Sequence, residues 1–419
     1  MTRCSLIAIG FAAVALAQIV LTPEQKRLNL ESFEFIWSAV HDQHWDPNFG
    51  SVDWNAAHDE LRPKIEHADT MTEARAIMRN LIGRLGKSHF ELIPSDAYGD
   101  LETTQGGDGT ARLDVRVLDG AATVTESAEE GVRTGWQIQS INDVELAATL
   151  RRVSELYRNS TTRELYLTRA VLAKLLGAAG TTVHVTFLDA GSRRVERDIV
   201  RTRPEGTPSR FGYLPTTYVW LKSRRLEGNI GYVRFNFFLD PAKVMQAFGD
   251  AVQSCMTCEG FIIDVRGNPG GIGVMAMGMA GWFIDKPDQR LGTMYMRQGP
   301  LKFIVNPRVK TYRGPVAILV DGASGSTSEV LAGGMKDLGR ARIFGTQTAG
   351  AALPSVIDRL PNGDAFQHAL ADYISEGGRS LEGVGVIPDV EVTLTREALL
   401  AGRDPVLQAA IEWVKSAHH

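Results

Sequence analysis

Over residues 214–405, short apolar runs alternate with stretches in which hydrophobic positions recur at the helical period. Short apolar runs rich in β-branched residues predict buried strands at 229–235, 260–265, 315–320 and 340–345. Amphipathic stretches between these runs predict helices at 243–254, 273–283 and 328–338. Strands that alternate with helices in this way are typical of an α/β core with a mostly parallel sheet.

Two other patterns precede this core. Residues 22–84 read as helical, because Phe33, Ile36 and Val40 fall on one helix face and the spacing returns at 72–85 after a threonine cap. Residues 106–201 carry alternating strand patterns around one predicted helix at 147–157. We therefore expect an α/β (α+β) fold with an N-terminal helical region at 22–100, an inserted β-rich domain at 106–201 and the core at 214–405.

The first residues have the pattern of a targeting segment. Arg3 precedes an apolar run at 4–16, and Ala15-Leu16-Ala17 offers a small-x-small cleavage site before Gln18. The run is too short for a comfortable membrane span. The pattern predicts a signal peptide at 1–17 and export, to the periplasm, with no stable membrane span after cleavage.

Composition narrows the function class. Of 419 residues, 44% are hydrophobic and 22% charged, which is ordinary for a globular protein, and the net charge of −4 gives no support for nucleic-acid binding. His41 and His44 lack a convergent carboxylate motif, so we expect neither a metal nor a cofactor. Cys255 and Cys258 have no second pair for zinc and are expected to be structural, either free or bridged.

The candidate chemistry begins with the segment at 320–351. A buried strand is followed by small and hydroxyl residues, and a helix then starts near Ser326. A serine on such a strand-to-helix turn exposes its Oγ, and the helix start directs backbone N–H groups at a bound ligand. An acyl-transfer nucleophile needs this geometry, although a plain helix cap in a Ser/Thr-rich loop has the same pattern.

Three motifs, in order, resemble those of the C-terminal processing peptidases, or tail-specific proteases. They are DVRGNPGG at 264–271, STSE at 326–329 and EGVGVIPD at 382–389. The resemblance implies a core like that of ClpP and crotonase, with Ser326 as the nucleophile. It also implies peptide or unfolded-protein substrates that are recognised by a free C-terminus. An aspartate that the family keeps on the next helix matches Asp337.

One family residue is missing. The best-known tail-cleaving members use a lysine where this chain has Ala351. The chain instead resembles the branch of the tricorn protease core and the interphotoreceptor retinoid-binding protein, whose Ser-His pair and glutamate match Ser88, His89 and Glu382. This resemblance makes His89 the general base for Ser326, oriented by the other two. The alternatives are a histidine satisfied by backbone, a turn-capping Ser88 and a solvated Glu382.

The same resemblance suggests where an oxyanion would bind. The N–H of Thr327, directly after the nucleophile, is one candidate donor, and the Asn-Pro-Gly-Gly turn supplies Gly271 or Gly270 as the other. That turn is also compatible with an ordinary tight turn. Asp264 and Arg266 are expected to support the loop.

The β-rich domain resembles a PDZ domain in the segment EGVRTGWQIQSIND at 130–143. A PDZ-like groove would bind an extended peptide as an added strand, whereas a small β-rich spacer is the alternative. Three functions remain: an exported serine endopeptidase, an inactive peptide-binding protein and a binder of small apolar ligands. We favour the peptidase, because an inactive homologue has no reason to keep Ser88, His89, Ser326 and Glu382 together.

Overall fold

The computed structural model describes residues 20–95, 108–210, 212 and 216–417. The signal peptide predicted at 1–17 lies outside these residues, as do the last residues of the predicted helical region. Within the described ranges, no helix is both long and apolar enough to cross a bilayer.

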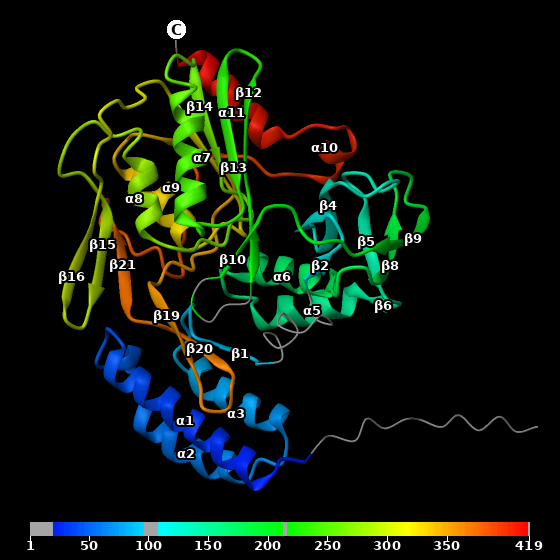
Figure 1. The fold of residues 1–419 in the computed structure, drawn as a ribbon, viewed down its shortest axis with the longest axis vertical. Helices are drawn as coiled ribbons and strands as arrows, with labels where there is room; N and C mark the ends of the chain where they lie inside the picture. The colour runs from blue at the N-terminus through cyan, green and yellow to red at the C-terminus, as the bar shows by residue number, and fades with distance from the viewer. Residues whose placement is uncertain (1–19, 96–107, 211, 213–215, 418–419) are drawn as a thin grey trace, which may run out of the picture.

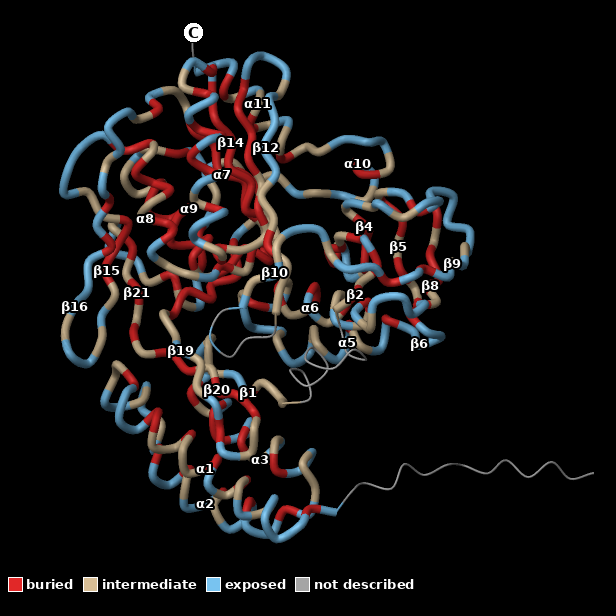
Figure 2. The backbone as a smooth tube through the Cα atoms, in the orientation of Figure 1, coloured by how far each residue is buried: buried red, intermediate tan, exposed pale blue. Residues whose placement is uncertain are grey.

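The core is built on a six-stranded sheet, seen edge-on at the top of Figure 1, with the order β12-β13-β14-β17-β18-β22. The first pair is antiparallel and the remaining pairs are parallel. Figure 2 shows the inner strands buried, as expected for a sheet covered on both faces. The strands are β12 (Leu221–Leu226), β13 (Ile230–Phe235), β14 (Gly260–Asp264), β17 (Val316–Val320), β18 (Arg342–Gly345) and β22 (Val390–Glu391).

Helices cover both faces of this sheet. One face packs against α7 (Pro241–Gln253), α8 (Val274–Ala280) and α9 (Thr327–Asp337), and the other against α11 (Pro405–Ser416). The predicted core ended at residue 405, but α11 buries Val406, Ala410 and Val414 against the sheet. The core therefore extends to the end of α11, and the short α10 (Arg396–Leu400) leads into it.

The predicted N-terminal helices are present, and a strand follows them. The helices are α1 (Pro23–Gln43), η1 (Phe49–Ser51), α2 (Trp54–Glu66) and α3 (Met71–Gly83). They pack on the sheet β1-β20-β19, made of β1 (Glu91–Ile93), β19 (Ser355–Arg359) and β20 (Ala365–Ala369). Since β1 pairs with β20, the chain just before β1 is held against the core.

Residues 108–202, here called the inserted unit, form an antiparallel sheet with its own hydrophobic core. Two helices pack on it, α5 (Leu146–Leu156) and α6 (Arg163–Leu175), of which only the first was predicted. The strands of this sheet are β3 (Leu113–Leu118), β4 (Ala121–Ser127), β5 (Gln137–Ile141), β6 (Val144–Glu145), β8 (Thr182–Leu188) and β9 (Arg194–Val200). A separate antiparallel pair is formed by β2 (Gly109–Thr110) and β7 (Leu176–Gly177).

Two smaller sheets complete the fold. One has the order β16-β15-β21 and is made of β15 (Arg290–Met296), β16 (Gly299–Ile304) and β21 (Ala371–Ser375). The other pairs β10 (Thr207–Ser209) with β11 (Thr217–Val219). The sequence did not decide whether Cys255 and Cys258 are free or bridged. In the structure they form a disulfide after α7, with a Cα–Cα distance of 5.0 Å.

Candidate active site

Ser326 occupies a strained turn between β17 and α9. Its φ of 53° and ψ of −117° lie where residues other than glycine are rarely found. Backbone strain of this kind persists only where the surroundings enforce it, and it clusters at functional sites. The Ser326 N–H donates to the Ala351 carbonyl (2.7 Å) and to Oε2 of Glu329 (2.9 Å). The side chain of Ser326 is left half-buried at the helix N-terminus.

Glu329, the last residue of the STSE motif, holds this turn from behind. Its fully buried carboxylate accepts hydrogen bonds on Oε2 from Ser326 and Ala351 and on Oε1 from Thr348 and Gly350, at 2.5–3.0 Å. Burial raises the pKa of Glu329 to about 7, although these donors act in the opposite direction. The sequence contained this glutamate in the motif, but gave no sign that it would bind the backbone of the nucleophile turn.

The glycine turn after β14 lies directly against Ser326. A Cβ on Gly270 would stand 2.7 Å from Cβ of Ser326, and a Cβ on Gly271 would overlap the Phe238 carbonyl, so both positions require glycine. The Thr327 hydroxyl donates to the Gly271 carbonyl (2.8 Å) and joins the two turns.

The N–H groups of the predicted oxyanion donors differ in availability. The Gly270 N–H already donates to Oδ1 of Asn268 (2.9 Å). The N–H groups of Gly271 and Thr327 take part in no hydrogen bond within the described part of the chain. Of the two glycines, Gly271 is therefore the one with a donor left for a ligand.

Ser88, His89 and Glu382 form a hydrogen-bonded chain. The Ser88 hydroxyl donates to Oε2 of Glu382 (2.7 Å), and the Ser88 N–H donates to Oε1 (2.8 Å). Nδ1 of His89 lies 2.8 Å from the Ser88 hydroxyl oxygen. Because that hydroxyl gives its single proton to the carboxylate, it can only accept from His89, which therefore carries its proton on Nδ1. Nε2 is then left with a free lone pair.

The surroundings keep this imidazole neutral. Burial, with a smaller contribution from the positive charge of Arg169, lowers the pKa of His89 to about 4. His89 also has a φ of 59°, so it shares with Ser326 a backbone conformation that is uncommon outside glycine. Burial raises the pKa of Glu382, and the donated hydrogen bonds from Ser88 and Ala352 oppose that shift.

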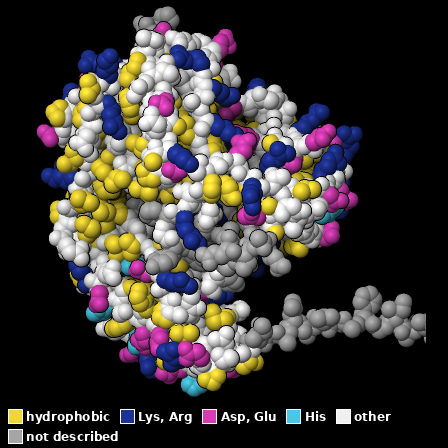
Figure 3. All heavy atoms as spheres, viewed as in Figure 1, with side chains coloured by type: hydrophobic (Ala, Val, Ile, Leu, Met, Phe, Trp, Pro, Cys, Tyr) yellow, Lys and Arg dark blue, Asp and Glu magenta, His cyan; other side chains and the backbone are white. Residues whose placement is uncertain are grey.

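These groups meet in one large cavity of about 1260 Å³. Ser88, His89, Ser326, Thr327, Gly270 and Gly271 all line it, whereas Glu382 lines a separate cavity of about 140 Å³. No hydrogen bond joins Ser326 to His89 among the described residues. Most of the wall is apolar, and Figure 3 shows hydrophobic side chains gathered over β15, β16 and β21 beside it.

The position of the missing lysine is filled by apolar packing. Ala351 lines the cavity and packs with Leu165, Ala323 and Ala349. Asp337, which matches a family aspartate, lies elsewhere and binds Arg379 and the N–H of Gly377. Within the described residues, no group of three or more His, Cys, Asp or Glu side chains could hold a metal ion.

Arg169 is a residue of the cavity that no sequence motif had indicated. It projects from α6 into the cavity and its guanidinium lies over the Tyr166 ring, 5.8 Å from the centroid. The i, i+4, i+8 spacing of Leu167, Val171 and Leu175 could have revealed α6, and with it a cation on another side of the helix. Nothing local in the sequence indicated that this helix would face His89.

Comparisons with known proteins give two family matches for this chain. Residues 229–392 match the model of peptidase family S41, and residues 28–83 match the Tricorn protease C1 domain. The chain is 25% identical over 410 residues to Tricorn protease homolog 1 of Streptomyces coelicolor. The aligned region covers 91% of this chain and 34% of that protein. It therefore spans about a third of that relative.

A second relative is matched almost end to end. The chain is 26% identical over 423 residues to a carboxyl-terminal-processing protease of Synechocystis, with 97% of this chain and 90% of that protein covered. Among solved structures, a photosystem II D1 C-terminal processing protease is similar with a TM-score of 0.58 and 23% identity, over 92% of this chain and 99% of that one. The structural likeness confirms the predicted mixed α/β fold.

Proposed function

Because the chain belongs to peptidase family S41, as its motifs predicted, we propose that it is a serine endopeptidase with Ser326 as nucleophile and His89 as general base. The observation that carries this proposal is the series of hydrogen bonds from Glu382 through Ser88 to His89. It leaves Nε2 of His89 free to accept a proton, and His89 lines the same cavity as Ser326. A site that only bound ligands would need neither these hydrogen bonds nor the strained Ser326 turn.

The chemistry follows from these positions. Oγ of Ser326 attacks the peptide carbonyl carbon while Nε2 of His89 takes its proton. The N–H groups of Thr327 and Gly271 stabilise the negative charge on the former carbonyl oxygen. His89 then gives the proton to the leaving amine as the C–N bond breaks. A water molecule, deprotonated by His89, finally hydrolyses the acyl-enzyme and restores Ser326.

Ser88 and Glu382 support this cycle without touching the substrate carbonyl. When His89 becomes an imidazolium, its Nδ1–H donates to the Ser88 hydroxyl, which is polarised by the Glu382 carboxylate. The negative charge of Glu382 thus stabilises the imidazolium through one intervening hydroxyl. A third group that orients the base in this way is the general logic of a catalytic triad.

The substrates we propose are peptides or unfolded protein tails with a free C-terminus. The cavity wall supports this proposal, because apolar side chains from several elements can receive apolar substrate side chains. The inserted unit would act as a PDZ-like module that adds the substrate as a strand. The protein would be exported, and mass spectrometry of exported material should find an N-terminus near Gln18.

The size and apolar lining of the cavity also suit a small apolar ligand, the second candidate function. Turnover separates the two candidates. The purified chain is incubated with unstructured peptides that carry either a free or an amidated C-terminus, and the products are identified by mass spectrometry. We expect cleavage of the free peptides and its loss in Ser326→Ala. Binding of apolar compounds with no cleavage of any peptide would favour the ligand binder.

A further inference from the structure

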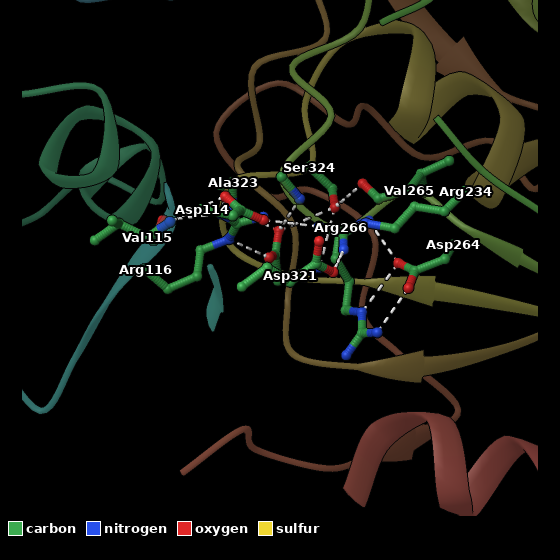
Figure 4. A network of polar contacts seen from close by, with 12 residues as sticks. Asp114, Val115, Arg116, Arg234, Asp264, Val265, Arg266, Asp321, Ala323 and Ser324 are labelled. Carbon is green, nitrogen blue, oxygen red and sulfur yellow. Dashed lines mark hydrogen bonds and ion pairs between the residues drawn. The ribbon is translucent and has the colours of Figure 1, made fainter. Parts of the chain in front are cut away.

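The inserted unit touches the nucleophile turn through a buried arginine. Arg116, on β3, is 8% exposed and donates from Nε to Oδ2 of Asp321 at 2.8 Å. Asp321 directly follows β17 and begins the turn that carries Ser326. Figure 4 shows Arg116 reaching from the inserted unit toward Asp321, while Arg266 and Asp264 lie on the core side.

Asp321 joins the two turns of the candidate active site. Its Oδ1 accepts from the N–H of Gly267 (2.8 Å), in the glycine turn, and from the N–H of Ala323 (3.0 Å), in the nucleophile turn. The Ser324 hydroxyl, in the nucleophile turn, also donates to the Val265 carbonyl, just before the glycine turn, at 2.8 Å. The orientation of the Asp321 carboxylate therefore sets how the glycine turn lies against the nucleophile turn.

Arg116 is itself fixed on both sides. Its Nη1 donates to Oδ1 of Asp114 (2.8 Å) and to the Val115 carbonyl (2.9 Å). A Cβ on Gly267 would overlap its Nη2, so the guanidinium packs directly on the glycine turn. Among the hydrogen bonds of the described residues, Arg116 is the only arginine that donates to Asp321. Without it, the Asp321 carboxylate would lose its cation and would be free to turn away from the Gly267 and Ala323 N–H groups.

We propose that Arg116 is a positioning residue, through which the inserted unit holds Asp321 and thereby aligns Ser326 with the Gly271 N–H. The proposal rests on the peptidase function proposed above. It makes the inserted unit part of the catalytic framework in addition to any role in binding peptides. A displacement of about 1 Å at such a site can cost about 100-fold in rate.

The test compares Arg116→Met with Arg396→Met. Arg396 is a matched control, because it also joins the core to the inserted unit, donating to the carbonyls of Gly135 (3.0 Å) and Asp189 (2.7 Å), but far along the chain from both turns. We expect Arg116→Met to lower kcat by about 10- to 100-fold with KM little changed, and to slow fluorophosphonate labelling of Ser326 equally. Arg396→Met should keep the wild-type kcat.

Replacing a buried arginine beside two carboxylates can also unfold the chain, so Arg116→Lys provides a second variant. Lysine keeps the charge but lacks the planar set of donors, so kcat should fall less than in Arg116→Met while the thermal unfolding midpoint stays near that of the wild type. Once Arg116 is gone, adding Asp321→Asn should reduce kcat by less than it does in the wild type, as expected for one coupled unit.

Several results would overturn the proposal. These are a wild-type kcat in folded Arg116→Met or Arg116→Lys, an equal loss in Arg396→Met, or additive effects of Arg116 and Asp321. A change in KM alone would assign Arg116 to substrate binding and would also overturn it. Failure of the peptidase function itself would look different, since the wild type would then cleave no peptide and take no label, or Ser326→Ala would retain the activity and the label of the wild type.

Discussion

Ser88 and Glu382 are 294 positions apart in the chain and are joined by two hydrogen bonds, one from the Ser88 backbone and one from its hydroxyl. The N-terminal segment reaches the core because β1 pairs with β20, and the Arg75–Asp364 ion pair (2.8 Å) holds α3 against the turn before β20. The proposed base and its supporting carboxylate are therefore brought together by tertiary structure alone. The bonds between Ser88 and Glu382 hold in place the Ser88 hydroxyl that accepts from His89.

The first prediction concerns how much turnover is lost when His89 or Glu382 is replaced. His89→Ala should lower turnover by about 10²- to 10⁴-fold, because it removes the proton acceptor. Glu382→Gln should cost less, since His89 remains and only its support is weakened. Steady-state kinetics on a peptide that the wild type cleaves through Ser326 measures both. Near wild-type turnover in His89→Ala would contradict the assignment of the base.

The second prediction follows from the environment of His89. Only the neutral imidazole can take a proton, so activity is present above the pKa of His89 and is lost as pH falls through it. Since burial and Arg169 lower that pKa to about 4, the acid limb of the labelling rate at Ser326 should lie below the ~6.5 of an ordinary histidine.

Removing the nearby cation should move this limb. Arg169→Gln eliminates a positive charge that disfavours the imidazolium, so the midpoint should rise. Lys174→Gln serves as the control, because it removes the same charge from the same helix at a position that does not line the cavity. The pH dependence of labelling in 0.1 M salt measures both variants. A limb at or above ~6.5 in the wild type, or no upward shift in Arg169→Gln, would count against the mechanism.

The third prediction concerns Glu329. Each carboxylate oxygen accepts from at least one backbone N–H, so in Glu329→Gln the amide nitrogen would face a backbone N–H in either orientation. The variant should lose about 1–3 kcal/mol of unfolding free energy, and it should lower kcat because Ser326 loses its backbone partner. Urea unfolding together with kinetics tests this. Glu397→Gln, on the exposed side of α10, should change neither quantity, and equal effects of the two substitutions would refute the role of Glu329.

The sequence predicted the parts of the fold that are encoded locally. The apolar runs at β14 and β17 and the helical spacing of α9 identified the core, and the motifs identified Ser326, His89 and Glu382 as candidates. Contacts between distant segments were not predictable in this way. The pairing of β1 with β20 and the Arg116–Asp321 ion pair depend on how separate units pack, and no spacing within one segment encodes that packing.

Fluorophosphonate labelling of the purified chain, with the modified residue mapped by mass spectrometry, tests the nucleophile most directly. We predict a single adduct on Ser326 that is absent in Ser326→Ala. Ser324→Ala and Ser328→Ala should still be labelled at Ser326, because both hydroxyls are buried and donate to backbone carbonyls. An adduct on Ser328, or no adduct on any serine of the folded protein, would contradict Ser326 as the nucleophile.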